Sequence, residues 1–462
     1  MTAARRIRRG AGAVVSLLIV AGTFFVVTTP WESVERSTLS ITTRPEPATS
    51  VLSCDGPIVA AGRDVDDPGA LQVAAGAQIV SGTAAGTPEP VVGEIASAIE
   101  GADPTPSFSA EPVDRVRADL AAAQSARVSA DDLAGFTAST CAPPAMETWL
   151  AAGSGLTGAS DLVVIANPGD VAARVDLTVF GVDGRVAPDA GANILVPAGE
   201  QRIIPLAALA LGEASPVVLV SATQAPVQAI LQSTLTRTLV PVGVDQGGAT
   251  GLPQTSQTIP AFSAVGGGDE PTDTTVRLLA PSDDTTASVT VTPVGGSMTA
   301  ASFPDLALTA GVPIEVDLDA LPEGRYRIEV QADAPVVAAA HASTGADAGS
   351  DFAWYGTADD IGVPTLVAVA DGPRPQLALV NPGADEVAAV LAGDAGAGEP
   401  REIRVPAGGS VSVDVAAGAL YRLDPAGGTL RASVTFTASD AIAGYAVVPA
   451  DAAAAPVEVR PR

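Results

Sequence analysis

The chain has 462 residues, enough for several domains, and 47% of them are hydrophobic, so it can bury substantial cores. It carries 52 acidic and 24 basic residues, a net charge of −28, and a surface this negative repels phosphate backbones. Nucleic acid is therefore excluded as an expected partner. The 47 Gly and 38 Pro residues favour short strands and turns over long helices.

A basic segment followed by an apolar run opens the chain. Residues 1–9 contain four arginines, and residues 10–29 contain no charged side chain. A helix of this length reaches across the roughly 30 Å hydrocarbon layer, and the arginines favour a cytoplasmic N-terminus. The pattern predicts a cytoplasmic tail over 1–9, a transmembrane anchor over 10–29, and a single-pass membrane protein whose C-terminal bulk is extracellular. Secretion after cleavage of a signal peptide is the alternative.

Two further segments precede the regular part of the chain. Residues 30–50 are rich in Ser, Thr and Pro and are interpreted as a stalk. Residues 51–144 are interpreted as an irregular N-terminal extension with a loop over 82–112 and, from the helical spacing of its apolar residues, a short helix over 113–128. Cys54 and Cys141 are predicted to form a disulfide, because two cysteines outside the cytoplasm most simply pair; two separate buried thiols are the alternative.

A repeat of about 100 residues then occurs three times. In each copy an apolar strand ends at a proline (Pro168, Pro281 and Pro382), alternating strands follow, and a hairpin closes the copy. The pattern predicts a mainly β fold with three tandem immunoglobulin-like antiparallel β-sandwich repeats over 145–250, 255–356 and 362–452. A β-propeller fits less well, because its blades are shorter and more of them are needed.

Catalytic motifs are missing from the sequence. His341 is the only histidine, which excludes a metal site built on several histidines, and it is interpreted as a polar residue at the end of a strand. The acidic turn that begins at Asp64 resembles the start of a calcium loop but lacks the acidic residue at position twelve. We therefore expect no catalytic residue, no metal, no cofactor and no enzymatic activity.

Three aromatic residues are candidate ligand-stacking residues: Trp149, Trp354 and Tyr355. Exposure of their rings on one face would indicate a sugar-binding platform, whereas burial would indicate packing in the core. The segment 341–355 at the end of the second repeat is the best candidate for a binding segment, because it has polar and aromatic residues that the other copies lack.

Several short motifs carry a resemblance to a known family. Together with the basic N-terminus and the apolar run, they resemble an uncharacterised family of secreted or membrane-anchored actinobacterial proteins, a domain of unknown function, over about residues 50–450. The motifs are Cys141, Trp149-Leu150, Gly158 to Leu162, Asn167-Pro168-Gly169, Val196 to Gly199, and Ser350-Asp351 with Trp354. The resemblance implies no activity and no site residues.

Two functions follow as hypotheses. The first is a non-catalytic cell-envelope protein, a membrane-anchored extracellular scaffold or interaction module for another envelope component. The second is a cell-surface protein that binds a glycan or polymer, as an accessory to hydrolysis.

Overall fold

The computed structural model describes residues 3–28, 41–43, 46–114, 116–265, 274–318, 321–393, 399–450 and 457–459. Two compact units divide the chain: Met1–Pro45 together with Ala454–Arg462, and Glu46–Ala453.

The first unit contains α1 (Ala3–Thr28) and an antiparallel pair of strands, β1 (Ile41–Thr43) and β35 (Val457–Val459). The helix includes most of the predicted tail and nearly all of the predicted anchor. Within the part of the chain that the structure describes, no helix is long and apolar enough to cross a membrane. The predicted stalk contains β1 and the start of β2, and its residues 30–40 and 44–45 lie outside the described residues.

Residues 46–144 form three small antiparallel sheets, β2-β7-β6, β3-β4 and β5-β8-β9. The predictions of an irregular extension, of a loop over 82–112 and of a helix over 113–128 were therefore wrong. Small side chains such as Ala122 and Ala123 let β8 pack closely between β5 and β9, and this pairing overrides local helical spacing. The strands are β2 (Ser50–Ser53), β3 (Ile58–Ala60), β4 (Gln72–Ala75), β5 (Gln78–Thr83), β6 (Val91–Ile95), β7 (Thr105–Ala110), β8 (Leu120–Ser129) and β9 (Ala134–Thr140).

The first repeat has two antiparallel sheets around a shared apolar core, β13-β12-β16-β10-β19 with β14 beside β12, and β15-β11-β17-β18. Its elements are β10 (Glu147–Leu150), β11 (Leu162–Ala166), β12 (Ala173–Gly181), β13 (Gly184–Val186), η1 (Asp189–Gly191), β14 (Ile194–Val196), β15 (Gln201–Pro205), α2 (Ala207–Ala210), β16 (Val217–Thr223), β17 (Gln228–Arg237), β18 (Val240–Gly247) and β19 (Ala249–Thr250).

The second repeat is joined by one long strand, β25, which pairs with β20 and β22 in its first half and with β21 and β26 in its second half. Its strands are β20 (Gln254–Ala264), β21 (Thr275–Leu279), β22 (Thr285–Pro293), β23 (Ala301–Leu308), β24 (Ile314–Asp317), β25 (Gly324–Ser343) and β26 (Phe352–Gly356).

The third repeat has two four-stranded sheets, β27-β32-β29-β30 and β31-β28-β33-β34. Its strands are β27 (Thr365–Ala368), β28 (Gln376–Val380), β29 (Val387–Gly393), β30 (Arg401–Val405), β31 (Ser410–Asp414), β32 (Leu420–Asp424), β33 (Arg431–Ala438) and β34 (Ala441–Ala446). The mainly β fold of antiparallel sheets is thus confirmed, and the likeness to immunoglobulin domains stays a prediction.

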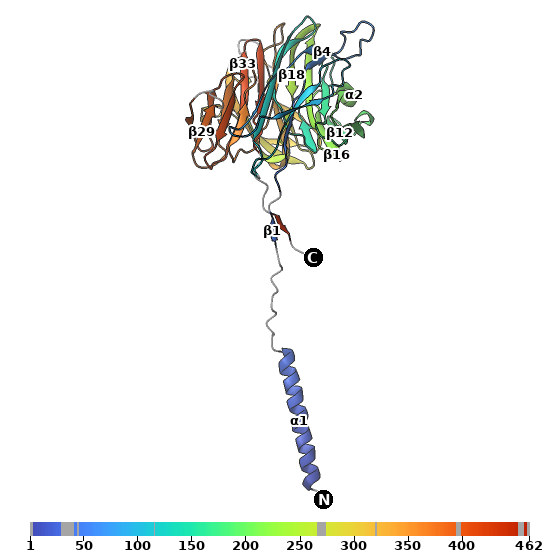
Figure 1. The fold of residues 1–462 in the computed structure, drawn as a ribbon, viewed down its shortest axis with the longest axis vertical. Helices are drawn as coiled ribbons and strands as arrows, with labels where there is room; N and C mark the ends of the chain where they lie inside the picture. Colours follow the sequence, from blue (N-terminus) through green and yellow to red (C-terminus); the bar gives the residue numbers. More distant parts are fainter. Residues whose placement is uncertain are drawn as a thin grey trace. The chain divides into compact units, whose positions relative to one another are not determined.

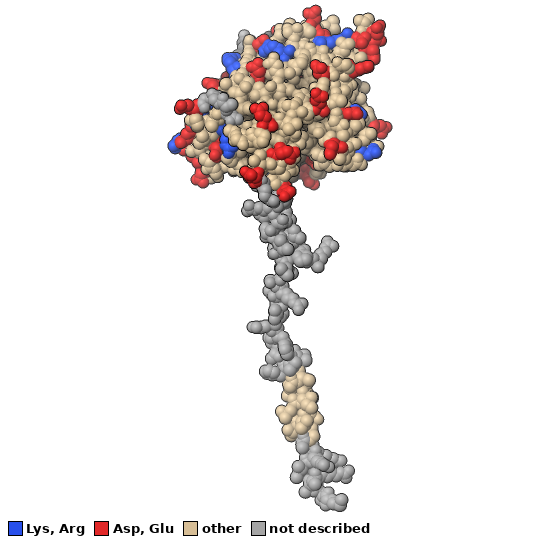
Figure 2. Space-filling model, in the orientation of Figure 1, with Lys and Arg blue, Asp and Glu red and all other residues tan. Residues whose placement is uncertain are grey.

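The three repeats and residues 46–144 belong to one compact unit because their apolar cores cross the repeat boundaries. Phe136 of β9 packs in the core of the third repeat, Trp354 of the second repeat packs in the core of the first, and Ile442 of the third packs in the core of the second. In Figure 1, β18 lies between the sheets that contain β29 and β33 and those that contain β12 and β16. Acidic side chains are spread over the visible face of this unit (Figure 2).

Four edge strands, one from each of four sheets, meet at the centre of the second unit. β9 contacts β18 and β34, and β26 contacts the same two strands. The central strands approach each other so closely that two positions require glycine. A Cβ at Gly135 would lie 2.7 Å from the backbone nitrogen of Val244, and a Cβ at Gly243 would lie 2.5 Å from a ring carbon of Phe352.

The predicted disulfide between Cys54 and Cys141 is confirmed. Both cysteines are buried with Leu52, Phe108 and Ala122. The bond joins the end of β2 to the segment after β9, so it fixes the residues that follow Cys54 beside the central strands.

The Asn-Pro-Gly motif is a structural turn that the first and third repeats share. Asn167 is buried, its side-chain nitrogen donates to the carbonyls of Val171 and Val196, and its side-chain oxygen accepts from the amide of Gly169. Asn381 makes the equivalent bonds to Asp385, Val405 and Gly383. Each asparagine therefore closes its turn and ties it to a neighbouring strand.

Replacing either buried asparagine by alanine should destabilise the second unit. Asn167→Ala and Asn381→Ala each leave two carbonyls and one amide without their partner, a loss of about 2–4 kcal/mol. Chemical denaturation of the full chain measures it. Gln331→Ala, which removes one exposed hydrogen bond to Ser256, is the control and should cost less than about 0.5 kcal/mol. Equal effects in all three variants would contradict the structural role of the turns.

Candidate functional site

Buried carboxylates connect the central edge strands through hydrogen bonds. Asp351, just before β26, accepts hydrogen bonds from the amides of Phe136 in β9 and Ile442 in β34, at 3.1 and 3.2 Å. Asp245 of β18 accepts from the amide of Trp354 in β26 at 2.8 Å. Edge strands leave backbone amides without a ladder partner, and here side-chain oxygens take the place of a neighbouring strand.

Glutamine side chains hold the segment from Asp55 to Val59 against these strands. The side-chain oxygen of Gln124 accepts from the amides of Asp55 and Gly56. Gln232 bonds both the amide and the carbonyl of Val59, as a neighbouring strand would. Buried polar side chains thus satisfy a buried backbone segment that leads into β3.

Six of the buried polar residues are called the polar axis. They come from β8, β17, β18 and two connecting segments, and none is more than 3% exposed. They are Asp55, Gln124, Gln228, Asp245, Gln246 and Asp351.

Burial dominates the electrostatics of the polar axis. It raises the pKa of Asp55 to about 6, although Ser139 and Gln228 beside it oppose the rise. It raises the pKa of Asp245 to about 7, and the nearby Asp55 carboxylate adds to this rise. The pKa of Asp351 is raised well above its ordinary value, mainly by burial and in part by Asp245. The cost of burying charge is therefore the main electrostatic feature of this centre.

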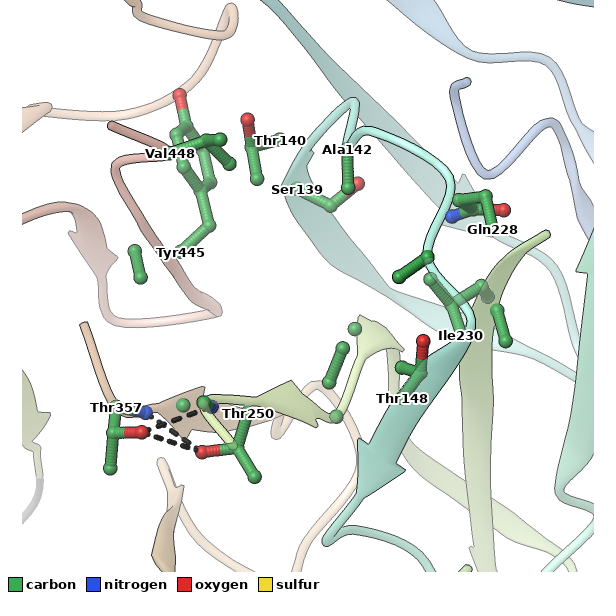
Figure 3. A pocket seen from close by; sticks show the side chains of 18 of the residues that line it. Ser139, Thr140, Ala142, Thr148, Gln228, Ile230, Thr250, Thr357, Tyr445 and Val448 are labelled. Carbon is green, nitrogen blue, oxygen red and sulfur yellow. Dashed lines mark hydrogen bonds between the residues drawn. The ribbon is translucent and has the colours of Figure 1, made fainter. Parts of the chain in front are cut away.

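A cavity of about 290 Å³, the end cavity, opens where the polar axis ends. Residues of β9, β10, β17, β18, β19, β26 and β34 and of their connecting segments line it, together with Asp55. Figure 3 shows Ser139, Gln228, Ile230 and Tyr445 around this space. Thr250 and Thr357 bond each other across its floor at 3.0 Å, so their hydroxyls are already engaged.

A larger cavity of about 840 Å³, the lateral cavity, lies between the first and second repeats. Phe352, Trp354 and His341 contribute aromatic rings to its wall, and His341 lies 4.8 Å from Trp354 between ring centroids. The wall also includes Ser233 and Thr234, whose buried hydroxyl oxygens have no hydrogen-bond partner among the described residues. A cavity of this size that combines apolar and polar groups is typical of ligand sites.

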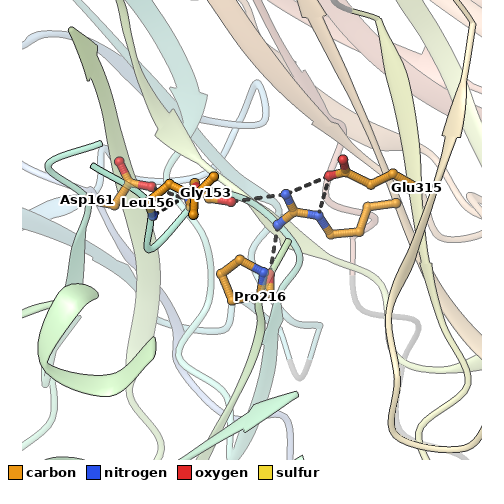
Figure 4. A network of polar contacts seen from close by, with 7 residues as sticks. Gly153, Leu156, Asp161, Pro216 and Glu315 are labelled. Atoms are coloured by element: carbon orange, nitrogen blue, oxygen red, sulfur yellow. Dashed lines mark hydrogen bonds and ion pairs between the residues drawn. The ribbon is translucent and has the colours of Figure 1, made fainter. Parts of the chain in front are cut away.

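Arg277 of β21 forms the junction between the two repeats at this cavity. Its buried guanidinium donates to the carbonyls of Pro216 and Gly153 in the first repeat, at 2.7 and 3.0 Å, and to Glu315 in the second (Figure 4). It also lies over the ring of Trp354, 4.5 Å from the centroid. Most donors of Arg277 are thereby used within the protein, which makes it a clamp between repeats and leaves little capacity for an anionic ligand.

Asp161 is a buried ionisable group on the same wall. It accepts from the amides of Ser154 and Thr234, at 2.7 and 2.9 Å. Burial raises its pKa to about 6, and Arg277 opposes the rise. Both carboxylate oxygens are therefore held by backbone amides, as expected for a structural group.

The candidate stacking residues are buried. Trp149, Trp354 and Tyr355 are 4%, 7% and 2% exposed, which is the outcome that indicates packing in the core rather than an exposed sugar platform. Trp149 packs on Phe180 and Tyr355 on Phe262, because these rings fill the cores between sheets. Trp354 lines both cavities, and Arg277 covers one face of its ring.

Sequence signals for the functional-site residues are weak. Arg277 stands out as a charge within an apolar strand, between Val276 and Leu278. Gln124 lies in a stretch of small residues and carries no recognisable motif. No group of three or more His, Cys, Asp or Glu side chains in the described ranges could hold a metal ion.

Asp245→Asn should change how stability depends on pH. Because the folded-state pKa of Asp245 lies above its unfolded value, the folded chain binds this proton more tightly. The resulting stability is full below about pH 4 and is lost as pH rises through about 7. The asparagine side chain has no titratable proton, and its oxygen still accepts the hydrogen bond from the amide of Trp354.

We compare the unfolding free energy of the Asp245→Asn variant with that of the original chain at pH 4.5 and pH 7.5. The difference should shift in favour of the variant by roughly 3–4 kcal/mol as the pH rises, since one pKa unit corresponds to about 1.4 kcal/mol. Urea denaturation at both pH values measures the difference. Asp283→Asn makes the same change at an exposed turn and should leave the two profiles parallel. If Asp245→Asn changes the unfolding free energy by the same amount at both pH values, this electrostatic account is refuted.

Comparison with known proteins adds no activity. No curated protein matches the sequence. The model of one family, described as a family of unknown function, DUF5719, matches residues 96–416, which include the central strands β9, β18 and β26. The chain therefore belongs to the DUF5719 family.

Proposed function

We propose that the chain is a non-catalytic cell-envelope protein that binds another envelope component through the lateral cavity. The observation that carries this proposal is the rim of that cavity. Leu156 and Leu239 line it and are 48% and 92% exposed. Large exposed apolar side chains beside a cavity favour contact with a partner, because binding removes their surface from water.

The conformation of the rim supports a binding role. Leu239 and Thr238 form the turn between β17 and β18 with φ values of 69° and 49°. Residues with a side chain rarely adopt this left-handed region, and such strain concentrates at functional sites. The turn thus holds an exposed leucine at the cavity at a cost to the folded chain.

Two features support a location of the protein outside the cytoplasm. The Cys54–Cys141 disulfide is typical of oxidising compartments. The arginines and apolar run at the N-terminus of the sequence favour export with a membrane tether, or secretion if that segment is cleaved. The acidic surface in Figure 2 favours partners other than nucleic acid.

The absence of catalysis is part of the proposal. It rests on the hydrogen bonds that polar groups at the lateral cavity already make within the protein. The oxygens of Asp161 already accept backbone amides, and Arg277 is already bound by Glu315 and two carbonyls. Groups fixed in this way are poor candidates for a general base or for an oxyanion partner.

Glycan binding is the second candidate. Ser233 and Thr234 could exchange hydrogen bonds with sugar hydroxyls, and Phe352 could contact a sugar ring. Arg277 already covers one face of Trp354, which reduces the aromatic surface available for stacking. A polypeptide that buries Leu156 and Leu239 is therefore favoured.

Photo-crosslinking in intact producing cells tests the proposal. A photoreactive residue in place of Leu156 should give a discrete adduct of higher mass. Leu239→Asp should reduce the yield about tenfold, because a charge on the rim disfavours burial by more than 1 kcal/mol. Met298→Asp is the matched control, since Met298 is 81% exposed and does not line the cavity.

Digestion identifies the occupant. A protease-sensitive adduct supports the interaction module, and an adduct sensitive only to glycan-cleaving enzymes supports the second candidate. No adduct at position 156, or an equal loss with Met298→Asp, would falsify the lateral cavity as the binding site.

A further inference from the structure

The end cavity shares Trp354 with the lateral cavity but otherwise has different lining residues, and its walls are acidic. Asp55, Glu147 and Asp359 contribute carboxylates, and no arginine lines it. Arg431 lies near Asp359 but is bound to Asp360 and Thr258, at 2.7 and 2.6 Å. The cavity therefore favours a positively charged occupant.

Buried acceptors at the cavity wall lack donors. Asp55 is 3% exposed, and its Oδ1 accepts from Gln228 at 2.7 Å. Its Oδ2 has no partner within hydrogen-bond distance among the described residues, although the Ser139 hydroxyl lies beside the carboxylate. Gln228 is also 3% exposed, and its side-chain oxygen lacks a donor in the same part of the chain. An unsatisfied buried acceptor is costly, so these two residues provide a second observation, independent of the acidic rim, that points to a ligand with donors.

The wall also has apolar side chains. Ile230 and Val448 face the space in Figure 3, and Ala229, next to Ile230 in the sequence, also lines the cavity. An alkyl chain can pack there while its charged end approaches the acceptors.

We propose that the end cavity binds a primary ammonium group on a short alkyl chain, with Asp55 as its main counter-charge. An ammonium brings three donors and one positive charge, which match a carboxylate and a neighbouring amide oxygen. At pH 7.5 the Asp55 carboxylate, whose pKa burial raises to about 6, is mainly ionised. The same chemistry occurs in a free alkyl amine and in a lysine side chain of a partner.

Calorimetric titration of the full chain in mild detergent at pH 7.5 tests the inference. n-Pentylammonium should bind at least tenfold more tightly than 1-pentanol, which has the same chain without the charge. Nα-acetyl-lysine methylamide, a lysine side chain with blocked backbone groups, distinguishes the two sources. Binding of both amines supports a lysine-bearing partner, and binding of n-pentylammonium alone supports a free amine.

Substitutions then locate the site. Asp55→Asn should weaken n-pentylammonium binding at least tenfold, and Asp283→Asn, the same change at an exposed turn away from the cavity, should leave it unchanged. If Asp55→Asn does not fold, the comparison of amine with alcohol in the original chain still decides the question. The inference is overturned if the amine binds no better than the alcohol, or if a folded Asp55→Asn variant binds it equally well. Neither outcome affects the lateral cavity, which the crosslinking at position 156 tests.

Discussion

The second unit depends on the junction of its four central edge strands. Each edge presents backbone amides that need acceptors, and the strands do not pair with one another in a ladder. Asp351 and Asp245 supply these acceptors from inside the protein. Charged carboxylates are costly to bury, so both have raised pKa values, and the junction is stable because directed hydrogen bonds offset that cost. Gly135 and Gly243 make the approach sterically feasible.

The N-terminal region completes this junction. It supplies β9, which is one of the four strands, and the segment from Asp55 to Val59, which the buried glutamines hold. The disulfide at Cys54 fixes the start of that segment. Phe136 packs in the core of the third repeat, so the repeats share their cores with their neighbours and with the N-terminal region. For this reason the repeats are better regarded as parts of one unit than as independent domains.

The two cavities follow from the same arrangement. Where the sheets of the first and second repeats diverge, Arg277 bridges the repeats and the lateral cavity remains beside it. Where the polar axis ends, the end cavity remains with acceptors that the protein does not satisfy internally. The first has an apolar rim and the second an acidic wall, so the two differ in the chemistry that they offer to a ligand. Both proposals use surfaces that exist because several sheets converge.

Much of the local structure could be read from the sequence. Alternating apolar residues and proline-ended strands predicted the mainly β fold of antiparallel sheets, and the pair of cysteines indicated the disulfide, because strand periodicity and turn chemistry are local properties. The sequence-based prediction was wrong for residues 82–128, since the Ala-rich β8 is a strand only through its partners β5 and β9. The polar axis, the Arg277 clamp and both cavities were decided by tertiary structure alone. Gln124, Asp245 and Asp351 resemble ordinary surface residues in the sequence, and their roles arise only when distant strands enclose them and remove them from water.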